Sequence, residues 1–201
     1  MDKQALDHFK TRDPVLHRLA LRVGKLEAIQ RERPQRYFAR LCREIICQQL
    51  SGKAGDTIFG RFVKLFPASL IRPSDVMNLS HDQLRAVGMS HAKADYLRHL
   101  AEAIVQRRLK INQYEAMDDQ AIVADLIMVK GIGQWTAEMF LMFVMGRPDV
   151  FSYGDLGLRK AIFKLYRLKP GRSAKQMQLI VDRWSPHKTY AARLLWASLE
   201  P

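Results

Sequence analysis

The segment KGIGQWTAEMF, residues 130–140, restricts the fold more than any other part of the chain, because two closely spaced glycines interrupt a helical pattern that resumes at once. The stretches DDQAIVADLIMV before the turn and QWTAEMFLMFVM after it have the apolar spacing of helices. Glycine allows positive φ and the close approach of another backbone. The sequence therefore predicts a helix–hairpin–helix unit with its turn at residues 128–136. An ordinary turn between two helices, closed by a glycine C-cap, is the alternative.

The start of the second hairpin helix is a candidate anion site. Backbone amides from about Gly133 to Trp135 have no acceptor within the helix, the helix dipole is positive there, and Lys130 lies beside them. The whole chain carries 33 lysine and arginine residues against 20 aspartate and glutamate residues, a formal charge of +13. A polyanion is therefore the expected partner, and nucleic acid is favoured over a surface that is merely basic.

Composition argues against several other classes of protein. Cys42 and Cys47 alone cannot supply a disulfide framework or a four-ligand zinc or iron–sulfur site, which indicates buried thiols in a reducing compartment. No uninterrupted apolar run reaches the ~18 residues that a membrane-spanning helix needs, and the first residues lack the pattern of a secretory leader. We expect a soluble, cytoplasmic protein with no membrane contact and no metal site.

Helix-start signals recur along the chain, whereas no stretch shows the alternation of a strand. Three patterns typical of N-caps are Asp13-Pro14, Ser80 with Gln83, and Ser185-Pro186. A chain of 201 residues is long enough to bury a core without disulfides. We therefore predict an all-α fold of helices joined by short loops.

The longest interruption of the helical pattern is GRPDVFSYGD, residues 146–155, and a loop of this kind is a candidate functional site. The stretch from Met128 to Arg159 contains this loop and the hairpin. It resembles the helix–hairpin–helix DNA glycosylase superfamily, whose signature is the hairpin, a Gly/Pro-rich loop and then an aspartate. Within the superfamily it is similar to the alkylbase glycosylases of the 3-methyladenine DNA glycosylase II (AlkA) type.

Three further segments extend the resemblance to roughly residues 37–196. They are IICQQLSGKAGDTIFGRF, LRAVGMSHAKADYLRHLA and WSPHKTYAARLLW. The resemblance implies one two-lobed, all-α domain over residues 1–201, with the active-site cleft between the lobes. The expected lobes are a central one of roughly residues 52–145 and a second one from roughly residues 1–51 and 146–201.

The aspartate of the family signature matches Asp155, which the resemblance places at the mouth of the pocket. A fixed carboxylate can stabilise the oxocarbenium-like charge that forms on the sugar as an N-glycosidic bond breaks, and it can orient the attacking water. An alkylated purine is already positive and leaves easily, so no metal or organic cofactor is implied, although a monovalent cation at the hairpin backbone fits the family. Asp155 could also simply N-cap the helix LGLRKAIFKLY, and the two roles are compatible.

Trp135 stands where bifunctional relatives, such as endonuclease III and 8-oxoguanine glycosylase, have a nucleophilic lysine. Tryptophan cannot form a Schiff base, so the resemblance implies a monofunctional glycosylase that leaves an abasic site. The indole offers an electron-rich face to a cationic base, worth about 0.5–2 kcal/mol. Core packing of Trp135 is the alternative. Met139, one turn further on, stands where AlkA-type enzymes can carry an aromatic pocket residue.

The remaining candidates for the wall of the base pocket are Gln48, Tyr153, Trp184 and His187. Gln48 could reach a base edge or a backbone group. His187 could line the pocket, or it could simply cap the helix that follows Pro186.

An extruded base leaves a gap in the duplex that a side chain can fill. The corner CQQLS matches the family's minor-groove wedge, which makes Gln49 or its neighbours Leu50 and Ser51 candidates for the plug. A helix end closed by Ser51 and Gly52 is the alternative. The other predicted DNA contacts lie in the two turns and among the basic residues: Lys53, Ser90, Lys130, Gly131, Gly133, Gln134, Thr136 and Arg159.

The sequence thus predicts a monomeric glycosylase that removes alkylated purines, such as 3-methyladenine or ethenoadenine, from double-stranded DNA by base flipping and so starts base-excision repair. A glycosylase for deaminated or mismatched bases is the alternative with the same chemistry. A non-catalytic helix–hairpin–helix module that binds DNA, and a helical scaffold for protein interactions, are the alternatives without it.

Overall fold

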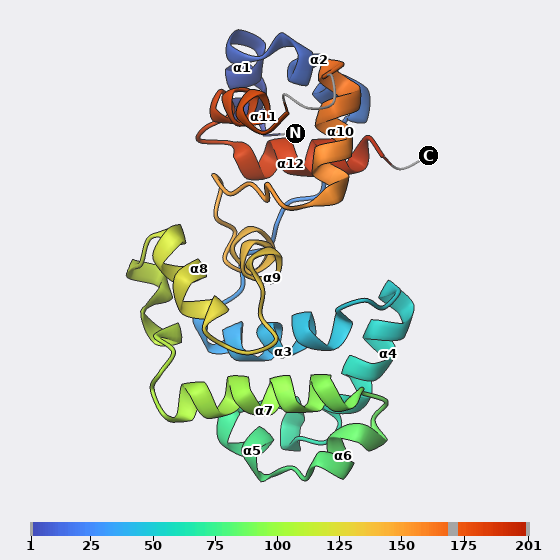
Figure 1. Cartoon of the computed structure of the whole chain (residues 1–201), viewed down its shortest axis with the longest axis vertical. Coiled ribbons are helices and arrows are strands. Elements are labelled where there is room, and N and C mark those ends of the chain that lie inside the picture. The colour runs from blue at the N-terminus through green and yellow to red at the C-terminus, as the bar shows by residue number, and fades with distance from the viewer. Residues whose placement is uncertain (1, 169–172, 200–201) are drawn as a thin grey trace. The chain divides into compact units, whose positions relative to one another are not determined.

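The computed structural model describes residues 2–168 and 173–199, and within these ranges every regular element is a helix (Figure 1). The all-α prediction is therefore confirmed. The chain divides into two compact units. We call Arg31–Phe140 the central unit, and Met1–Gln30 together with Leu141–Pro201 the terminal unit. Among the described residues, no helix has the length and apolar character to cross a membrane.

The central unit is built around α7 (His91–Val105). Helix α3 (Tyr37–Cys47) packs on one side of α7, and α5 (Pro73–Asn78) and α6 (His81–Ala86) pack on the opposite side (Figure 1). Helix α4 packs on α3, and α8 packs on α9. The bounds of these further elements are Gly52–Val63 for α4, Asp119–Ile127 for α8 and Gln134–Met139 for α9, with 3-10 helices at Pro34–Arg36, Pro67–Ser69 and Ile111–Ala116.

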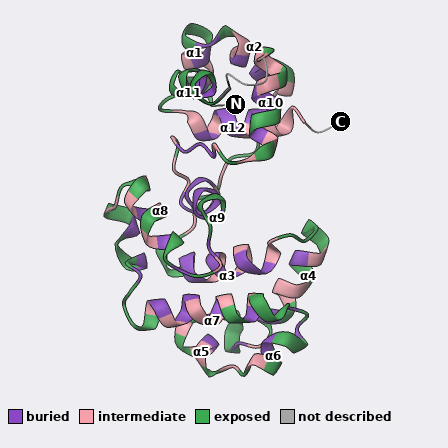
Figure 2. Ribbon diagram, viewed as in Figure 1, coloured by how far each residue is buried: buried purple, intermediate pink, exposed green. Residues whose placement is uncertain are grey.

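Apolar residues at helical intervals explain why these helices pack together. On α3, Phe38, Leu41 and Ile45 are all buried, and on α7 Leu97 and Leu100 are buried as well (Figure 2). A fully buried side chain of this size contributes about 2 kcal/mol relative to its exposed state. The apolar faces of the helices therefore supply the core of the central unit.

The terminal unit combines both ends of the chain. Helix α1 (Lys3–Arg12) packs on α2 (Pro14–Val23), and both α2 and α10 (Leu156–Tyr166) pack on α12 (Lys188–Ala197) (Figure 1). Helix α11 (Ser173–Asp182) completes this unit. Distant parts of the sequence thus form one core.

Asp13 joins these distant segments. One carboxylate oxygen accepts hydrogen bonds from the amides of Val15 and Leu16 at 3.1 and 3.0 Å, which confirms the predicted N-cap of α2. The other oxygen accepts from the hydroxyl of Tyr166 at 2.7 Å and from the indole N–H of Trp184 at 2.9 Å. The capping pattern in the sequence did not indicate this second set of partners.

The first of the two predicted lobe boundaries needs correction. The first boundary follows Gln30 instead of lying near residue 51, because α3 packs against α4 and α7 and so belongs to the central unit. The second boundary lies between Phe140 and Leu141, inside a π-helix (Phe140–Val144) that continues α9.

Of the helix starts predicted at Ser80 and Ser185, the structure confirms the first and contradicts the second. Ser80 and Gln83 form a complete capping box at the start of α6, as expected. The Ser185 prediction is wrong, because the hydroxyl of Ser185 donates to Asp149 at 2.6 Å and α12 begins only at Lys188.

Candidate active site

The hairpin turn between α8 and α9 contains two glycines with different conformations. Gly131 has a φ of 101°, and a Cβ atom there would overlap the ring of Tyr96. Gly133 has a φ of −94°, which any residue can adopt, and it faces open space. The expectation of positive φ is therefore correct for Gly131 and wrong for Gly133. At Gly133, the absent side chain leaves room in front of the backbone.

Gln48, at the end of α3, supports this turn. Its side-chain amide donates to the carbonyl of Gly131 at 3.0 Å and to the hydroxyl of Thr136 at 3.3 Å. The sequence left open whether Gln48 reaches a base edge or a backbone group, and in the structure it bonds to a backbone group, the carbonyl of Gly131. Thr136 is only 5% exposed, so its side chain does not face outward toward DNA. Its hydroxyl instead helps to join the hairpin to α3.

Helix α9 exposes Trp135 and buries Met139. The side chain of Trp135 is 46% exposed, so core packing is wrong for this residue. Gln134 is also exposed, and its side chain donates to Glu138 at 2.8 Å. Beyond α9 the helix widens into the π-helix Phe140–Val144, a form that is frequent at functional sites.

The corner between α3 and α4 is an exposed turn. Gln49 has a φ of 57°, a left-handed conformation that is uncommon outside glycine, and Leu50 is 38% exposed. Ser51 begins α4 as its N-cap by accepting from the amide of Ala54 at 3.4 Å. Ser51 therefore starts the next helix, and the idea that it closes the preceding one is wrong.

A surface hollow of about 460 Å³ is lined by residues of both this corner and the hairpin. Its lining includes Gln48 and Gln49 of the corner, Ser90 and Lys93 at the start of α7, and Gly131 and Gly133 of the hairpin. Ser90 N-caps α7 by accepting from the amide of Lys93 at 3.3 Å. Three segments predicted to contact DNA thus meet at one place on the central unit.

In the terminal unit, the loop of residues 146–155 ends at Asp155, the N-cap of α10. One oxygen of this half-buried carboxylate accepts from the amide of Leu158 at 2.7 Å and from the indole N–H of Trp196 at 3.2 Å. The predicted capping role of Asp155 is confirmed. Trp196 was missed in the sequence, although it ends the segment WSPHKTYAARLLW whose resemblance to the family was noted.

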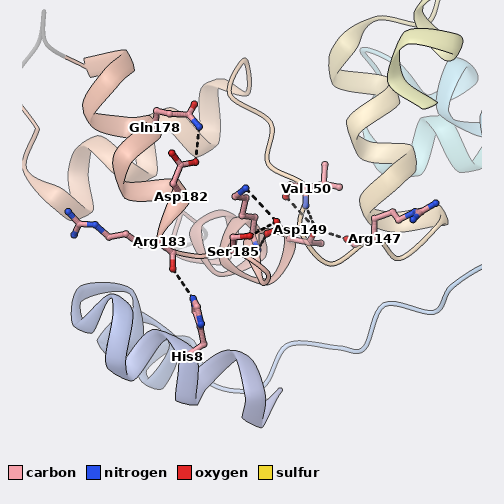
Figure 3. Close-up of polar contacts among 10 residues, drawn as sticks. His8, Arg147, Asp149, Val150, Gln178, Asp182, Arg183 and Ser185 are labelled. Atoms are coloured by element: carbon pink, nitrogen blue, oxygen red, sulfur yellow. Dashed lines mark hydrogen bonds and ion pairs between the residues drawn. The ribbon is translucent and has the colours of Figure 1, made fainter. Parts of the chain in front are cut away.

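Helix α12 also holds the middle of this loop (Figure 3). The buried hydroxyl of Thr189 accepts from the amide of Val150 at 3.1 Å and donates to the carbonyl of Arg147 at 2.7 Å. Asp149 lies beside them and accepts from the hydroxyl of Ser185, in the turn before α12, and from the amide of Lys188, the first residue of α12 (Figure 3). Because α12 bonds the loop at both its middle and its end, α12 positions the carboxylate of Asp155.

The three pocket residues predicted in the terminal unit have different surroundings. Trp184 is 0% exposed and bonds to Asp13, so it is part of the core and its place in a pocket wall is wrong. His187 occupies the N-cap position of α12 without a side-chain cap bond, so the capping alternative is wrong, and its ring packs edge-on against His8. Burial raises the pKa of Tyr153 to about 12, so its phenol stays protonated at neutral pH.

Three of the predicted phosphate-binding residues, Lys53, Lys130 and Arg159, are exposed. Burial raises the pKa of both thiols, Cys42 and Cys47, so neither is a thiolate at neutral pH. Within residues 2–168 and 173–199, no group of three or more histidine, cysteine, aspartate or glutamate side chains could hold a metal ion.

Comparison with known proteins connects these features to one family. Residues 42–187 match the family model described as the HhH-GPD superfamily base excision DNA repair protein. The chain is 33% identical to the Bacillus subtilis protein YfjP over 163 residues, which cover 78% of this chain and 56% of YfjP. It thus spans about half the length of that relative.

Two solved structures resemble the fold over nearly its whole length. The crystal structure of a DNA-3-methyladenine glycosidase from Bacillus halodurans has a TM-score of 0.86 and 34% identity, covering 98% of this chain and 89% of that one. The Schizosaccharomyces pombe 3-methyladenine DNA glycosylase Mag1, in complex with abasic DNA, has a TM-score of 0.81 and 30% identity, covering 96% of this chain and 95% of that one. The matched residues include the corner, the hairpin and the loop that ends at Asp155, and the chain belongs to the HhH-GPD superfamily of base excision DNA repair proteins.

Proposed function

We infer that this protein is a monofunctional DNA glycosylase that hydrolyses the N-glycosidic bond of alkylated purines in duplex DNA. The observation that carries this inference is Asp155, a carboxylate that the backbone of α10 and the indole of Trp196 hold at the end of the family's signature loop. Relatives named for 3-methyladenine removal, one of them bound to abasic DNA, support the same substrate class. Base-excision repair begins with this reaction.

Asp155 acts on the sugar. As the N-glycosidic bond breaks, its electron pair leaves with the alkylated purine, which departs as a neutral base, and positive charge develops on the sugar. The carboxylate of Asp155 stabilises this charge and orients a water molecule whose oxygen bonds to the anomeric carbon. The proton lost by that water passes to the carboxylate or to solvent. The products are a free base and an abasic site.

Trp135 acts on the base. Its exposed indole is a flat surface on which a cationic purine can stack, and the positive charge strengthens this contact by about 0.5–2 kcal/mol. A neutral, undamaged purine lacks that contribution, so the indole favours alkylated bases. Because Trp135 stands in place of a lysine nucleophile, the enzyme leaves the strand intact after base removal.

The corner between α3 and α4 acts on the duplex. Extruding a nucleotide costs a few kcal/mol, and a side chain that fills the gap lowers that cost. Gln49 and Leu50 are exposed at this corner, and the amides at the start of α9 lie across the same hollow. We therefore place the minor groove over the corner and a phosphate against Gly133, with Lys53, Lys130 and Arg159 adding charge.

The chemistry requires no metal or organic cofactor, because an alkylated purine is a good leaving group. A monovalent cation would be held by hairpin carbonyls such as those of Val129 and Gly131. Each of these carbonyls accepts one hydrogen bond in the structure and keeps a second lone pair. We further propose that the protein acts as a monomer on chromosomal DNA in the cytoplasm.

Single-turnover base release from duplexes with 3-methyladenine or ethenoadenine tests the function directly. Wild type should release base, and Asp155→Asn should slow release by about 100- to 1,000-fold, as expected when a charge-stabilising group is lost. Asparagine caps a helix about as well as aspartate, so the melting temperature and DNA affinity should hardly change. Equal rates for both proteins would show that Asp155 is only a cap.

Parallel substrates separate the alternatives. Duplexes with hypoxanthine or a mismatched uracil should react more slowly than those with alkylated purines, since neither base is cationic. Faster release from the deaminated duplexes would favour the other glycosylase class. DNA binding that falls steeply with salt, without release of any base, would indicate a non-catalytic DNA-binding module.

A further inference from the structure

The exposed corner between α3 and α4 is held by a lysine from a different helix. The ammonium of Lys93, in the first turn of α7, donates to the carbonyl of Ile46 at 2.8 Å and to the carbonyl of Gln48 at 2.7 Å. These carbonyls end α3, where the helix dipole is negative and a lysine is favourable. Desolvation lowers the pKa of Lys93, as expected for a lysine turned toward the protein.

The residue that follows these carbonyls is strained. Gln49 adopts the left-handed region with a φ of 57°. For a residue other than glycine this conformation costs about 1–3 kcal/mol and persists only where the surroundings enforce it. The bonds of Lys93 to the carbonyl of Gln48, directly before Gln49, and to that of Ile46 supply such enforcement. The turn bond from the amide of Leu50 to the carbonyl of Cys47, at 3.2 Å, completes it.

The same turn of α7 also supports the hairpin. Tyr96, three residues after Lys93 and on the same helix face, packs its ring against Gly131. Gln48 connects the two supported segments, because its side chain donates to the carbonyl of Gly131 at 3.0 Å. The start of α7 is thus a common base for the corner and the hairpin.

We propose that Lys93 is a positioning residue for base extrusion: it holds the corner in the conformation that presents Gln49 and Leu50 to the duplex. Lys93 acts through the corner and makes no contact of its own with the reacting atoms. The inference rests on the proposed function, since it requires that the corner enters the minor groove.

Lys93→Met tests the support in the free protein, because methionine keeps the apolar stem and removes the ammonium. Amide hydrogen exchange of residues 47–52 should speed up by about tenfold, the equivalent of one lost charge-assisted interaction. Lys64→Met, at an exposed lysine just after α4, is the matched control and should leave that segment unchanged. Unchanged exchange in Lys93→Met would overturn the proposal.

A duplex with an abasic analogue and 2-aminopurine in the opposite strand tests the consequence without any catalysis. Insertion of a protein side chain changes the stacking of 2-aminopurine and therefore its fluorescence. Wild type and Lys64→Met should change the fluorescence equally, whereas Lys93→Met should do so less at full saturation. An equal change with Lys93→Met would contradict the proposal.

A double-mutant cycle separates positioning from direct contact with DNA. In single-turnover base release, Lys93→Met should slow wild type by about tenfold, but it should slow the variant Gln49→Ala/Leu50→Ala by less than about twofold. Equal slowing in both backgrounds would mean that Lys93 contacts a phosphate, and the proposal would fail. If wild type itself releases no base, the proposed function fails, and the exchange and fluorescence measurements still decide the role of Lys93.

Discussion

The hairpin of the central unit and the loop of residues 146–155 in the terminal unit are both turns that precede a helix, but they are stabilised in different ways. The hairpin depends on the absence of side chains. At Gly131 a Cβ atom would overlap Tyr96, and at Gly133 the space in front of the backbone is open. The loop depends on side-chain hydrogen bonds, chiefly those of Thr189 and Trp196 from α12.

The difference corresponds to what each turn is proposed to do. A turn that receives a phosphate must leave its backbone amides accessible, and glycine does this at no steric cost. A carboxylate that stabilises a transition state must be held in place before the reaction, and buried hydrogen bonds do this. Four substitutions test this contrast, from the largest expected effect to the smallest.

Gly131→Ala should be the most damaging change in the hairpin. Alanine must adopt a positive φ and displace the ring of Tyr96, which together should lower the free energy of unfolding by about 3 kcal/mol. Denaturant titration measures this loss. A variant with wild-type stability would show that the hairpin tolerates a side chain at this position. It would contradict the statement that the hairpin depends on the absence of side chains.

Thr189→Val should weaken the loop while keeping the shape of the side chain. Valine leaves the buried amide of Val150 without its acceptor, so the free energy of unfolding should fall by about 2 kcal/mol. Base release should slow as well, because Asp155 ends the same loop. Thr189→Ser, which keeps the hydroxyl, serves as the control and should release base faster than Thr189→Val.

Trp196→Phe should affect chemistry more than folding. Phenylalanine keeps the packing against Phe143 but removes the N–H that Asp155 accepts, so base release should slow by about tenfold, or ~1.4 kcal/mol. DNA affinity should be unchanged. In an Asp155→Asn background the same substitution should have almost no further effect, and a full tenfold loss there would assign Trp196 a role independent of the carboxylate.

Gly133→Ala should have the smallest effect on folding and a specific effect on binding. A methyl group fits the open space and the ordinary φ, so stability should change by less than about 0.5 kcal/mol. A bound phosphate would compete for that space, so affinity for an abasic duplex should fall about fivefold, or ~1 kcal/mol. Unchanged affinity would place the phosphate elsewhere on the hollow.

The features that sequence analysis predicted correctly depend on neighbours along the chain. The capping box of Ser80 and Gln83, the caps at Asp13 and Asp155 and the glycine turn at Gly131 were all visible, because each needs only local geometry. The loop and its aspartate were found as well, since family resemblance follows short motifs.

The errors concern burial and partners that are distant in sequence. Trp184 was assigned to the pocket wall, yet its side chain lies in a core and donates to Asp13. Thr136 was assigned to DNA contact, and the structure adds a bond that its hydroxyl accepts from Gln48. A motif shows that a residue matters and does not show which way its side chain faces. Ser185 was mistaken for a cap for the same reason, since its partner Asp149 lies 36 positions away.

The sequence by itself therefore determined the helical class and the hairpin, because these follow from local conformational preferences, and its resemblance to the family pointed to Asp155. Only the tertiary structure decided that Trp135 is exposed, that α12 positions Asp155 and that Lys93 holds the corner. These depend on segments that folding brings together, and the packing of a core, which no local pattern encodes, selects which of them meet.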